Sequence, residues 1–473
     1  MTPPFEPSAL FRRGNDLLAQ GRPADALADF NAALQAVGAH PDVLNSRGIA
    51  LQMLGRHAEA LADFDRALAF AATNPMIHAN RGAALTELGR LADAARSLTT
   101  AVGLDPGNAT TLHNYGNVLR DLDRTAEALS AYDRALALRP DYVDALIARG
   151  LALMDLKRLD EAKASFANAL ARAPDHPKAR LNAAIRDLLA GDIGNGFAGY
   201  EWRWRNPPND SWLRDFPQPL WLGREDIVGK TLLLHAEQGL GDTLHFCRYA
   251  ALAAERGARV VLEVQRPLVR LLASLEGVAQ IVARGDALPA FDLHCPLMSL
   301  PLAFGTVARH TPYIQAAPSD WSTRLPSGRR IGLAWSGNPA LKNDRHRSIP
   351  LARFAPLMDG TALVSAQKDF RPGDAAFAQG CIADFGAELA DFADTAALIA
   401  ALDVVISVDT AAAHLAGALG KPVYILLPYI GTDWRWGVDG ETTPWYPTAK
   451  LLRQPAPGDW DSVIARLKAE LKL

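Results

Sequence analysis

The chain has 473 residues and a formal net charge of −3 at pH 7, a length that predicts two or three domains rather than one core. Because the net charge is slightly negative, the chain has no general attraction to nucleic acid or to an anionic membrane, and any basic site must be local. The three cysteines lie far apart without a CxxC pair, which argues against a zinc site or a disulfide framework and favours a reducing compartment. The sequence shows no signal pattern and no apolar run of membrane-spanning length, so it predicts a cytoplasmic protein without membrane insertion.

Residues 9 to about 205 form a repeat array with a period of 34 residues. A glycine recurs at this period, at Gly14, Gly48, Gly82, Gly116 and Gly150. An alanine also recurs, at Ala26, Ala60, Ala94, Ala128 and Ala162, and a large apolar residue follows each alanine by four positions. This pattern resembles the tetratricopeptide repeat, with five clear copies and a degenerate sixth that begins near Pro177. The resemblance implies an all-α solenoid over residues 1–205, with a concave groove.

Asparagines recur two positions before the repeat glycine, at Asn80 and Asn114, and Asn182 occupies the equivalent place in the sixth copy. A side-chain amide both donates and accepts hydrogen bonds, so a row of amides can hold an extended peptide without reading its sequence. A solvated helix face explains the same residues equally simply, and the pattern leaves both interpretations open.

Between Asn206 and Gly229 the repeat stops, and a segment rich in proline and tryptophan predicts a packed connector. From Lys230 onward, predicted strands alternate with predicted helices. The strands are expected at residues 231–236, 259–264, 279–283, 291–294, 330–335, 362–366, 404–408 and from 423. The helices are expected at residues 242–256, 267–275, 297–303, 351–358, 395–402, 411–419 and 459–473. This order predicts two parallel α/β halves, residues 206–325 with the connector and 326–473, with a ligand cleft between them.

A βαβ unit at residues 404–427 carries the clearest site in the second half. Asp409 and Thr410 form the predicted turn and N-cap, and Ala411 opens a helix of small residues that contains His414. The free backbone N–H groups at such a helix start suit an anion, and a diphosphate is the natural ligand. A structural helix cap without any ligand is the alternative.

Two further loops follow predicted strands. In residues 235–245, two glycines precede Asp242, which is either a helix cap or a carboxylate placed to take a proton from an attacking hydroxyl. In the second half, Ser336 and Asn338 lead into four cationic side chains between Lys342 and Arg347. With Lys368 after the next strand, this loop predicts an anion clamp, although a solvated charged loop is the alternative.

Several common active-site patterns are missing from the sequence. It contains neither a GxxxxGK[ST] nor a GxGxxG motif, which disfavours a P-loop kinase and a nicotinamide enzyme. A GxSxG elbow is also missing, and the histidines show no metal-ligand spacing. The sequence therefore predicts a site with no metal and no bound cofactor.

Three motifs carry a family resemblance: Gly241-Asp242-Thr243-Leu244-His245, Arg347-Ser348-Ile349-Pro350, and Asp409 to Ala416. Together they resemble GT-B glycosyltransferases of the ADP-heptose:lipopolysaccharide heptosyltransferase type. Behind tetratricopeptide repeats, they resemble bacterial protein glycosyltransferases related to O-GlcNAc transferase, some of which modify flagellin. The resemblance implies two Rossmann-like halves with a nucleotide-sugar co-substrate in the cleft. The chain departs from the family at Arg347, where lysine is usual, and in the segment 431–436.

The resemblance also implies a role for each matching residue. Asp242 is the expected catalytic base, and His245 of the same motif is expected at the acceptor. The donor and its phosphates are expected at Ser336, Asn338, Arg347, Lys368, Asp409, Thr410, Ala411 and His414. Asn80 and Asn114 are expected to hold a protein acceptor, and Trp434 and Trp436 either stack on the donor or pack in the core.

The sequence-based hypothesis is a metal-independent transferase that moves a sugar from a nucleotide sugar to a protein recruited by the repeats. One alternative is a non-catalytic repeat scaffold with a degenerate nucleotide-binding module. Another is a transferase that acts on a glycan or lipid-linked acceptor.

Overall fold

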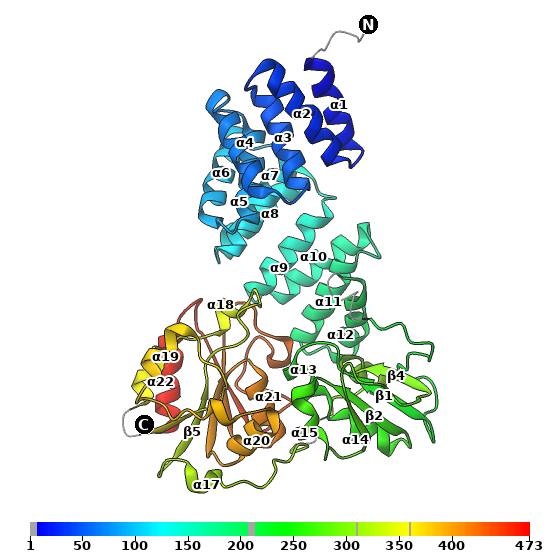
Figure 1. The fold of residues 1–473 in the computed structure, drawn as a ribbon, viewed down its shortest axis with the longest axis vertical. Coiled ribbons are helices and arrows are strands. Elements are labelled where there is room, and N and C mark those ends of the chain that lie inside the picture. Colours follow the sequence, from blue (N-terminus) through cyan, green and yellow to red (C-terminus); the bar gives the residue numbers. More distant parts are fainter. Residues whose placement is uncertain (1–6, 207–212, 309–310, 359–360) are drawn as a thin grey trace. The chain divides into compact units, whose positions relative to one another are not determined.

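The computed structural model describes residues 7–206, 213–308, 311–358 and 361–473. The chain forms two compact units, Met1–Ala179 and Arg180–Leu473. In Figure 1 the first unit contains helices only, and the second contains helices and strands. The first six residues and residues 207–212 of the predicted connector lie outside the described part.

The first unit consists of helical hairpins with short turns. Its helices are α1 (Pro7–Ala19), α2 (Pro23–Val37), α3 (Pro41–Met53), α4 (His57–Phe70), α5 (Pro75–Glu87), α6 (Leu91–Leu104), α7 (Ala109–Asp121), α8 (Thr125–Leu138), α9 (Val143–Asp155) and α10 (Leu159–Arg172). The repeat alanines are fully buried. Each hairpin therefore follows the predicted period of the sequence.

The repeat glycines let the two helices of each hairpin approach closely. A Cβ atom built on Gly48 would lie 2.5 Å from the ring of Phe64, and one on Gly116 would lie 2.5 Å from the ring of Tyr132. Real side chains do not tolerate such distances, so the large residue needs a partner without a side chain. The glycine and the apolar residue sixteen positions later thus form one packing unit.

Ion pairs add to this packing within and between hairpins. Arg47 pairs with Asp63 of its own hairpin at 2.7 Å. Arg81 instead reaches back to Asp65 of the preceding hairpin at 2.6 Å. Arg149 reaches back to Asp133 over the same distance of 2.6 Å. Arginines at equivalent repeat positions therefore pair within one hairpin in some repeats and between neighbouring hairpins in others.

The sixth hairpin, α11 (Pro177–Leu189) and α12 (Ile193–Tyr200), groups with the second unit, although the sequence placed it with the repeats. Its helices approach through glycines on the second helix, because a Cβ on Gly199 would lie 2.8 Å from that of Ala184. Phe197 meets the ring of Trp434 edge-on at 5.3 Å. This aromatic contact joins the hairpin to the α/β elements.

Two parallel sheets form the rest of the second unit. The first has the order β3-β2-β1-β4, and the second has the order β6-β5-β7-β8-β9. The strands are β1 (Thr231–His235), β2 (Arg259–Val264), β3 (Val278–Ala283), β4 (Leu293–Pro296), β5 (Arg330–Ala334), β6 (Ala362–Ser365), β7 (Val404–Val408), β8 (Val423–Leu427) and β9 (Ala449–Arg453). The chain reverses direction across each sheet beside its first strand, β1 or β5. Ligands of open parallel sheets bind at such switch points, outside the carboxyl ends of the strands.

Helices connect and cover these strands. They are α13 (Leu240–Phe246), α14 (Tyr249–Glu255), α15 (Val269–Leu272), α16 (Leu300–Phe304), α17 (Trp321–Arg324), α18 (Asp344–Arg347), α19 (Pro372–Ala378), α20 (Phe392–Ala400), α21 (Ala411–Ala418) and α22 (Trp460–Leu471). Short 3₁₀ turns are η1 (Glu201–Arg205), η3 (Arg266–Leu268), η4 (Leu297–Ser299), η5 (Leu351–Leu357), η6 (Gly386–Glu388) and η7 (Trp434–Trp436). Among the described helices, none has both the length and the apolar character that a membrane crossing requires.

Several of the expected elements need correction. The helix expected at residues 242–256 is two helices, separated at residues 247–248, where the buried Arg248 side chain donates to the carbonyl of His245. The helix expected at 351–358 is the 3₁₀ segment η5, which contains Pro356. Strand β9 was not predicted. In the described part of the connector, Trp221 is fully buried against Phe304, which agrees with the expected packing.

Gly116→Ala is expected to lower the unfolding free energy of the first unit by about 1–3 kcal/mol, because the new methyl group would overlap the Tyr132 ring. Urea unfolding followed by circular dichroism measures this change. Gly103→Ala is the matched control: Gly103 lies in α6 with open space around it, so alanine should raise stability by up to about 1 kcal/mol. Equal stability of the two variants would contradict the packing argument.

Candidate functional site

A pocket of about 1000 Å³ lies at the carboxyl edges of both parallel sheets within the second unit. The loop after β1 contributes residues Gln238 to Asp242, and Met298 follows β4. In the second sheet, the loops after β5, β6 and β7 contribute the segments 336–338, 366–369 and 409–412. The pocket therefore occupies the switch points of both sheets, where ligands are expected.

Helix α21 begins at the pocket wall. Thr410 is its N-cap residue, with extended backbone angles, but its side chain does not cap the helix. The Thr410 hydroxyl lies 3.2 Å from the hydroxyl of Ser407 instead. Ala411 and Ala412 line the pocket, and the first N–H groups of a helix attract anions. The predicted helix start thus faces an open space.

Arg347 lies beside this helix start. Its Nη1 donates to the backbone carbonyl of Asp409 at 2.9 Å, and its Nε donates to Asp344 at 3.3 Å. The guanidinium lies against Gly337, where a Cβ atom would come within 2.5 Å of Nη2. The glycine therefore makes room for a cation at the pocket wall.

The other residues predicted on these loops also line the pocket. The Ser336 hydroxyl accepts from the Gln367 amide at 3.1 Å, while Gln367 accepts the backbone N–H of Trp335 at 2.9 Å. Asn338 is exposed and its side chain accepts from Ala340 in its own turn. Lys368 is exposed at the rim. The structure brings these three predicted residues to the same cavity as Thr410.

Asp242 is the third residue of α13, and not its N-cap as one sequence interpretation proposed. Its Oδ2 accepts the backbone N–H of Gly239 at 2.9 Å, and its Oδ1 pairs with Nη2 of Arg435 at 2.5 Å. Burial raises the pKa of Asp242, the charge of Arg435 lowers it, and the charge of Asp433 raises it further. The side chain keeps about a fifth of its surface exposed, 22%, on the pocket wall.

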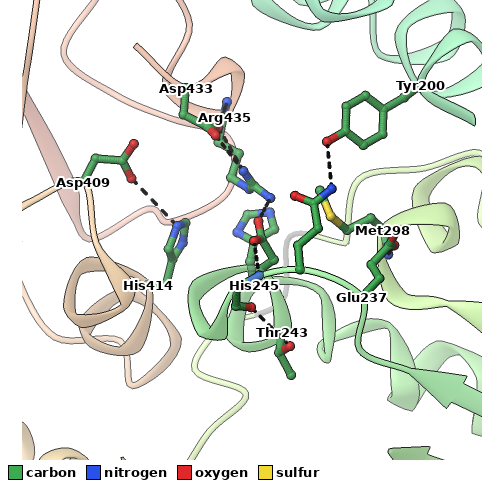
Figure 2. Close-up of polar contacts among 12 residues, drawn as sticks. Tyr200, Glu237, Thr243, His245, Met298, Asp409, His414, Asp433 and Arg435 are labelled. Carbon is green, nitrogen blue, oxygen red and sulfur yellow. Dashed lines mark hydrogen bonds and ion pairs between the residues drawn. The ribbon is translucent and has the colours of Figure 1, made fainter. Parts of the chain in front are cut away.

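Asp409 also lines the pocket, beside His414 (Figure 2). Its Oδ1 is 4.0 Å from Nε2 of His414. Burial, followed by the charge of Asp433, raises the pKa of Asp409 to about 7, while Arg347 and Arg435 oppose this change. This carboxyl group therefore keeps its proton to a higher pH than an ordinary aspartate.

Two buried histidines share one tyrosine hydroxyl beneath the pocket. The hydroxyl of Tyr446 lies 2.9 Å from Nδ1 of His245 and 3.0 Å from Nδ1 of His414. His414 still reaches the pocket wall, whereas His245 is completely buried and does not. The position of His245 thus fits a structural link between α13 and α21, not the acceptor contact expected from its motif.

Trp434 and Trp436 are mainly core residues. Trp436 is 2% exposed and stacks on His414 at 5.3 Å. Trp434 touches the pocket but packs among Phe197, Tyr200 and Phe246. Of the two interpretations for these tryptophans, core packing is the one that their contacts favour.

Asn80 and Asn114 lie in the first unit, at equivalent positions of α5 and α7, and both are half-buried. The Asn80 amide donates to the side chain of Asn45 at 2.9 Å. Asn182 lies on α11, with the second unit. Within the described residues, no group of three or more His, Cys, Asp or Glu side chains is arranged to hold a metal ion.

Comparisons with known proteins identify the helical part. Tetratricopeptide-repeat models match residues 11–75 and 143–176, and a further TPR model matches residues 116–157. The N-terminal hairpins are tetratricopeptide repeats. These matches, like the structure, support the resemblance that the repeat period suggested.

Individual relatives are distant from this chain. Protein FlbA of Caulobacter vibrioides is 28% identical over 329 residues, which cover 60% of this chain and 53% of FlbA. The chain thus spans about half the length of this curated relative. A thermophilic TPR protein of Thermus thermophilus is 26% identical with a TM-score of 0.34, covering 39% of this chain and 100% of that one. PilF of Pseudomonas aeruginosa is 18% identical with a TM-score of 0.39, covering 43% and 92%.

Sequence reasoning missed several residues around this pocket. Arg435 was noted only within a segment that departs from a family pattern, and its contact with Asp242 joins residues 193 positions apart. Ile185 and Tyr200 reach the pocket from the sixth hairpin. Buried Arg203 binds Glu237, which precedes the Asp242 loop, through Nε at 2.9 Å. The sequence gives one indication of this contact, the position of Arg203 between two tryptophans. An arginine that is buried among large aromatic residues needs a partner of opposite charge.

The two buried histidines predict acid sensitivity of the second unit. Burial, aided by nearby arginines, holds the pKa values of His245 and His414 well below their usual range. In the unfolded chain histidine binds a proton below about pH 6.5, so the unfolding free energy should fall with pH there, by up to about 1.4 kcal/mol per pH unit for each ring. All ten tryptophans follow residue 200, so their fluorescence during urea unfolding reports this unit.

His414→Asn should show a weaker dependence of stability on pH between 7.5 and 5, because asparagine does not take up a proton. His40→Asn is the control, since the His40 side chain is 52% exposed. A His414→Asn variant whose stability depends on pH as steeply as that of the parent would contradict the assignment of a neutral, buried His414 ring.

Proposed function

We propose that this protein is a cytoplasmic glycosyltransferase with a GT-B-type α/β region. It transfers a sugar from a nucleotide sugar to a protein that the tetratricopeptide repeats recruit. The α/β motifs that resemble heptosyltransferases and O-GlcNAc transferase-like enzymes motivate this proposal. The observation that carries it is that the start of α21, Arg347 and Asp242 all line one pocket.

The donor side of the proposal rests on electrostatics. The free N–H groups of α21 and the Arg347 guanidinium suit the diphosphate of a nucleotide sugar. Lys368, an exposed lining residue, adds a further cation. The α21 N–H groups and the Arg347 guanidinium are already in place before the reaction. They therefore stabilise the charge that develops on the leaving diphosphate without further reorganisation.

The acceptor side rests on Asp242. In the proposed step, the acceptor hydroxyl oxygen bonds to the anomeric carbon of the sugar, and its proton passes to the Asp242 carboxylate. The bond between that carbon and the diphosphate oxygen breaks, and the nucleotide leaves with the electron pair. A carboxyl group with a raised pKa is a better base than an ordinary aspartate, which supports this role.

The repeats supply the acceptor in this proposal. Repeat solenoids present extended surfaces to their partners, and the amides of Asn80 and Asn114 lie on successive first helices. A flagellin-like protein is the acceptor class that the resemblance suggests. A repeat scaffold without catalysis, or a glycan acceptor, is distinguished by the experiments below.

Asp242→Asn and Arg347→Ala should separate turnover from binding. A thermal-shift screen with UDP-, ADP-, GDP- and CMP-sugars first identifies the donor. With that donor, Asp242→Asn should keep its affinity in calorimetry and reduce turnover by about 10²–10⁴-fold. Arg347→Ala should weaken donor binding by about tenfold or more, because it removes a charge-assisted hydrogen bond.

Arg353→Ala is the matched control for these variants, since Arg353 is an exposed arginine of the same half that pairs with Asp461. It should bind and turn over the donor like the parent. A parent protein that neither hydrolyses nor transfers any of these sugars would leave the scaffold as the better explanation.

The double variant Asn80→Ala/Asn114→Ala tests the acceptor. Loss of both amides should reduce modification of the protein acceptor at least about tenfold, at roughly 0.5–1.5 kcal/mol per hydrogen bond, without changing donor hydrolysis. The control is Gln35→Ala/Asn168→Ala, which removes two exposed amides on second helices. Mass spectrometry of the acceptor measures the modification, and equal loss in both double variants would contradict the role of the first-helix amides.

A further inference from the structure

Arg435 is a buried cation that connects the two sheets of the second unit. It lies in η7, which follows β8 of the second sheet, and its side chain is only 3% exposed. The rings of Trp434 and Phe246 lie over its guanidinium at 4.5 and 5.1 Å. Its partner Asp242 belongs to α13, which follows β1 of the first sheet. This ion pair therefore joins an element that follows the first sheet's β1 to one that follows the second sheet's β8.

The guanidinium is held by two carboxylates at once. Its Nη2 contacts Oδ1 of Asp242 at 2.5 Å, and its Nη1 contacts the two oxygens of Asp433 at 3.0 and 2.9 Å. Asp433 also accepts the backbone N–H of Arg435 at 2.9 Å. Figure 2 shows Arg435 between Asp433 and the start of α13. A planar guanidinium bound on two edges has little freedom to rotate.

Asp242 is fixed just as firmly. One of its oxygens faces Arg435 and the other accepts the N–H of Gly239 at 2.9 Å. Two donors on different oxygens set the plane of the carboxylate, and the remaining lone pairs are the ones available to a ligand. The orientation of this candidate base therefore depends on a residue from the opposite sheet.

Two charged side chains act in opposite directions on Asp242. Arg435 contributes a positive charge and Asp433 a negative charge, with opposite effects on the pKa of Asp242. The other ionisable groups nearby are the Tyr200 hydroxyl, Asp409, and the buried, neutral rings of His245 and His414. Removing Arg435 and removing Asp433 must therefore act in opposite directions, which makes the arrangement testable.

We propose that Arg435 is a positioning residue that holds the Asp242 carboxylate ionised and in one orientation at the pocket wall, and that links this wall to the second sheet. The consequence for turnover rests on the proposed function. The ion pair and its effect on the ionisation of Asp242 do not depend on the proposed function. Each can be measured without an assay of turnover.

The first experiment needs no activity. Tryptophan-monitored urea unfolding from pH 4 to 9 gives the difference in unfolding free energy between the parent and Asp242→Asn. The pKa of Asp242 is raised in the folded state, so the parent loses stability relative to Asp242→Asn as the pH rises. The difference becomes constant above the folded pKa. We call the pH above which this difference is constant the levelling point. In the Arg435→Gln background the levelling point should move to higher pH, and in the Asp433→Asn background it should move to lower pH.

Arg435→Lys keeps the charge, so its levelling point should stay near that of the parent. If Arg435→Gln does not fold, the Asp433→Asn and Arg435→Lys backgrounds still test whether these charges set the ionisation of Asp242. The same levelling point in all folded backgrounds would overturn the proposal.

The second experiment uses turnover of the donor found by the screen. The acid limb of the pH–rate profile should move to higher pH in Arg435→Gln and to lower pH in Asp433→Asn, with the donor affinity unchanged. Arg435→Lys should keep the position of this limb and lose turnover, because lysine does not fix the carboxylate plane. Absence of turnover in the parent would refute the proposed function alone, whereas turnover with an unmoved profile in Arg435→Gln would refute the role of Arg435.

Discussion

The close approach of α13 and α21 is the constraint on which the pocket depends. A Cβ atom on Gly241 would lie 2.9 Å from the ring of His414, so the first turn of one helix lies directly on the side of the other. One turn further along α21, Gly417 lies against Tyr446, where a Cβ would come within 2.4 Å of the ring in the same way. Because each helix follows a strand beside the switch point of its own sheet, this contact brings both switch points to one cavity.

Buried charge then sets the chemistry of that cavity. Removing ions from water is costly, so each buried ion needs a partner with good geometry. Arg435 meets this condition with Asp242 and Asp433, and Arg203 meets it with Glu237, Glu201 and the Ser299 hydroxyl. Arg203, from the end of the sixth hairpin, binds Glu237 between β1 and α13, and Arg435, which follows the second sheet's β8, binds Asp242 in α13. The carboxylate of Asp242 is thus oriented by elements that are distant in sequence.

The tetratricopeptide repeats follow a different principle. Each hairpin is stabilised by a glycine that packs on an apolar residue sixteen positions later, and arginine–aspartate pairs act within a hairpin or between neighbouring ones. Such units add one after another, and their stability is close to a sum over neighbours. The sixth hairpin breaks this rule, because Phe197 and Tyr200 pack against Trp434. Its sequence resembles a repeat, but its aromatic contacts are with the α/β region.

The sequence alone determined the repeats, the parallel α/β pattern and most of the pocket loops, because these rest on periodicity, strand-to-helix turns and small residues, which act over short distances. Asp242, Arg347 and Thr410 were found on that basis, and the structure brings them to one cavity. Only the tertiary structure decided that His245 is buried, that the sixth hairpin joins the second unit, and that Arg435 pairs with Asp242. These outcomes depend on which side chains meet across more than a hundred residues, and packing and desolvation at such contacts leave no local pattern in the chain.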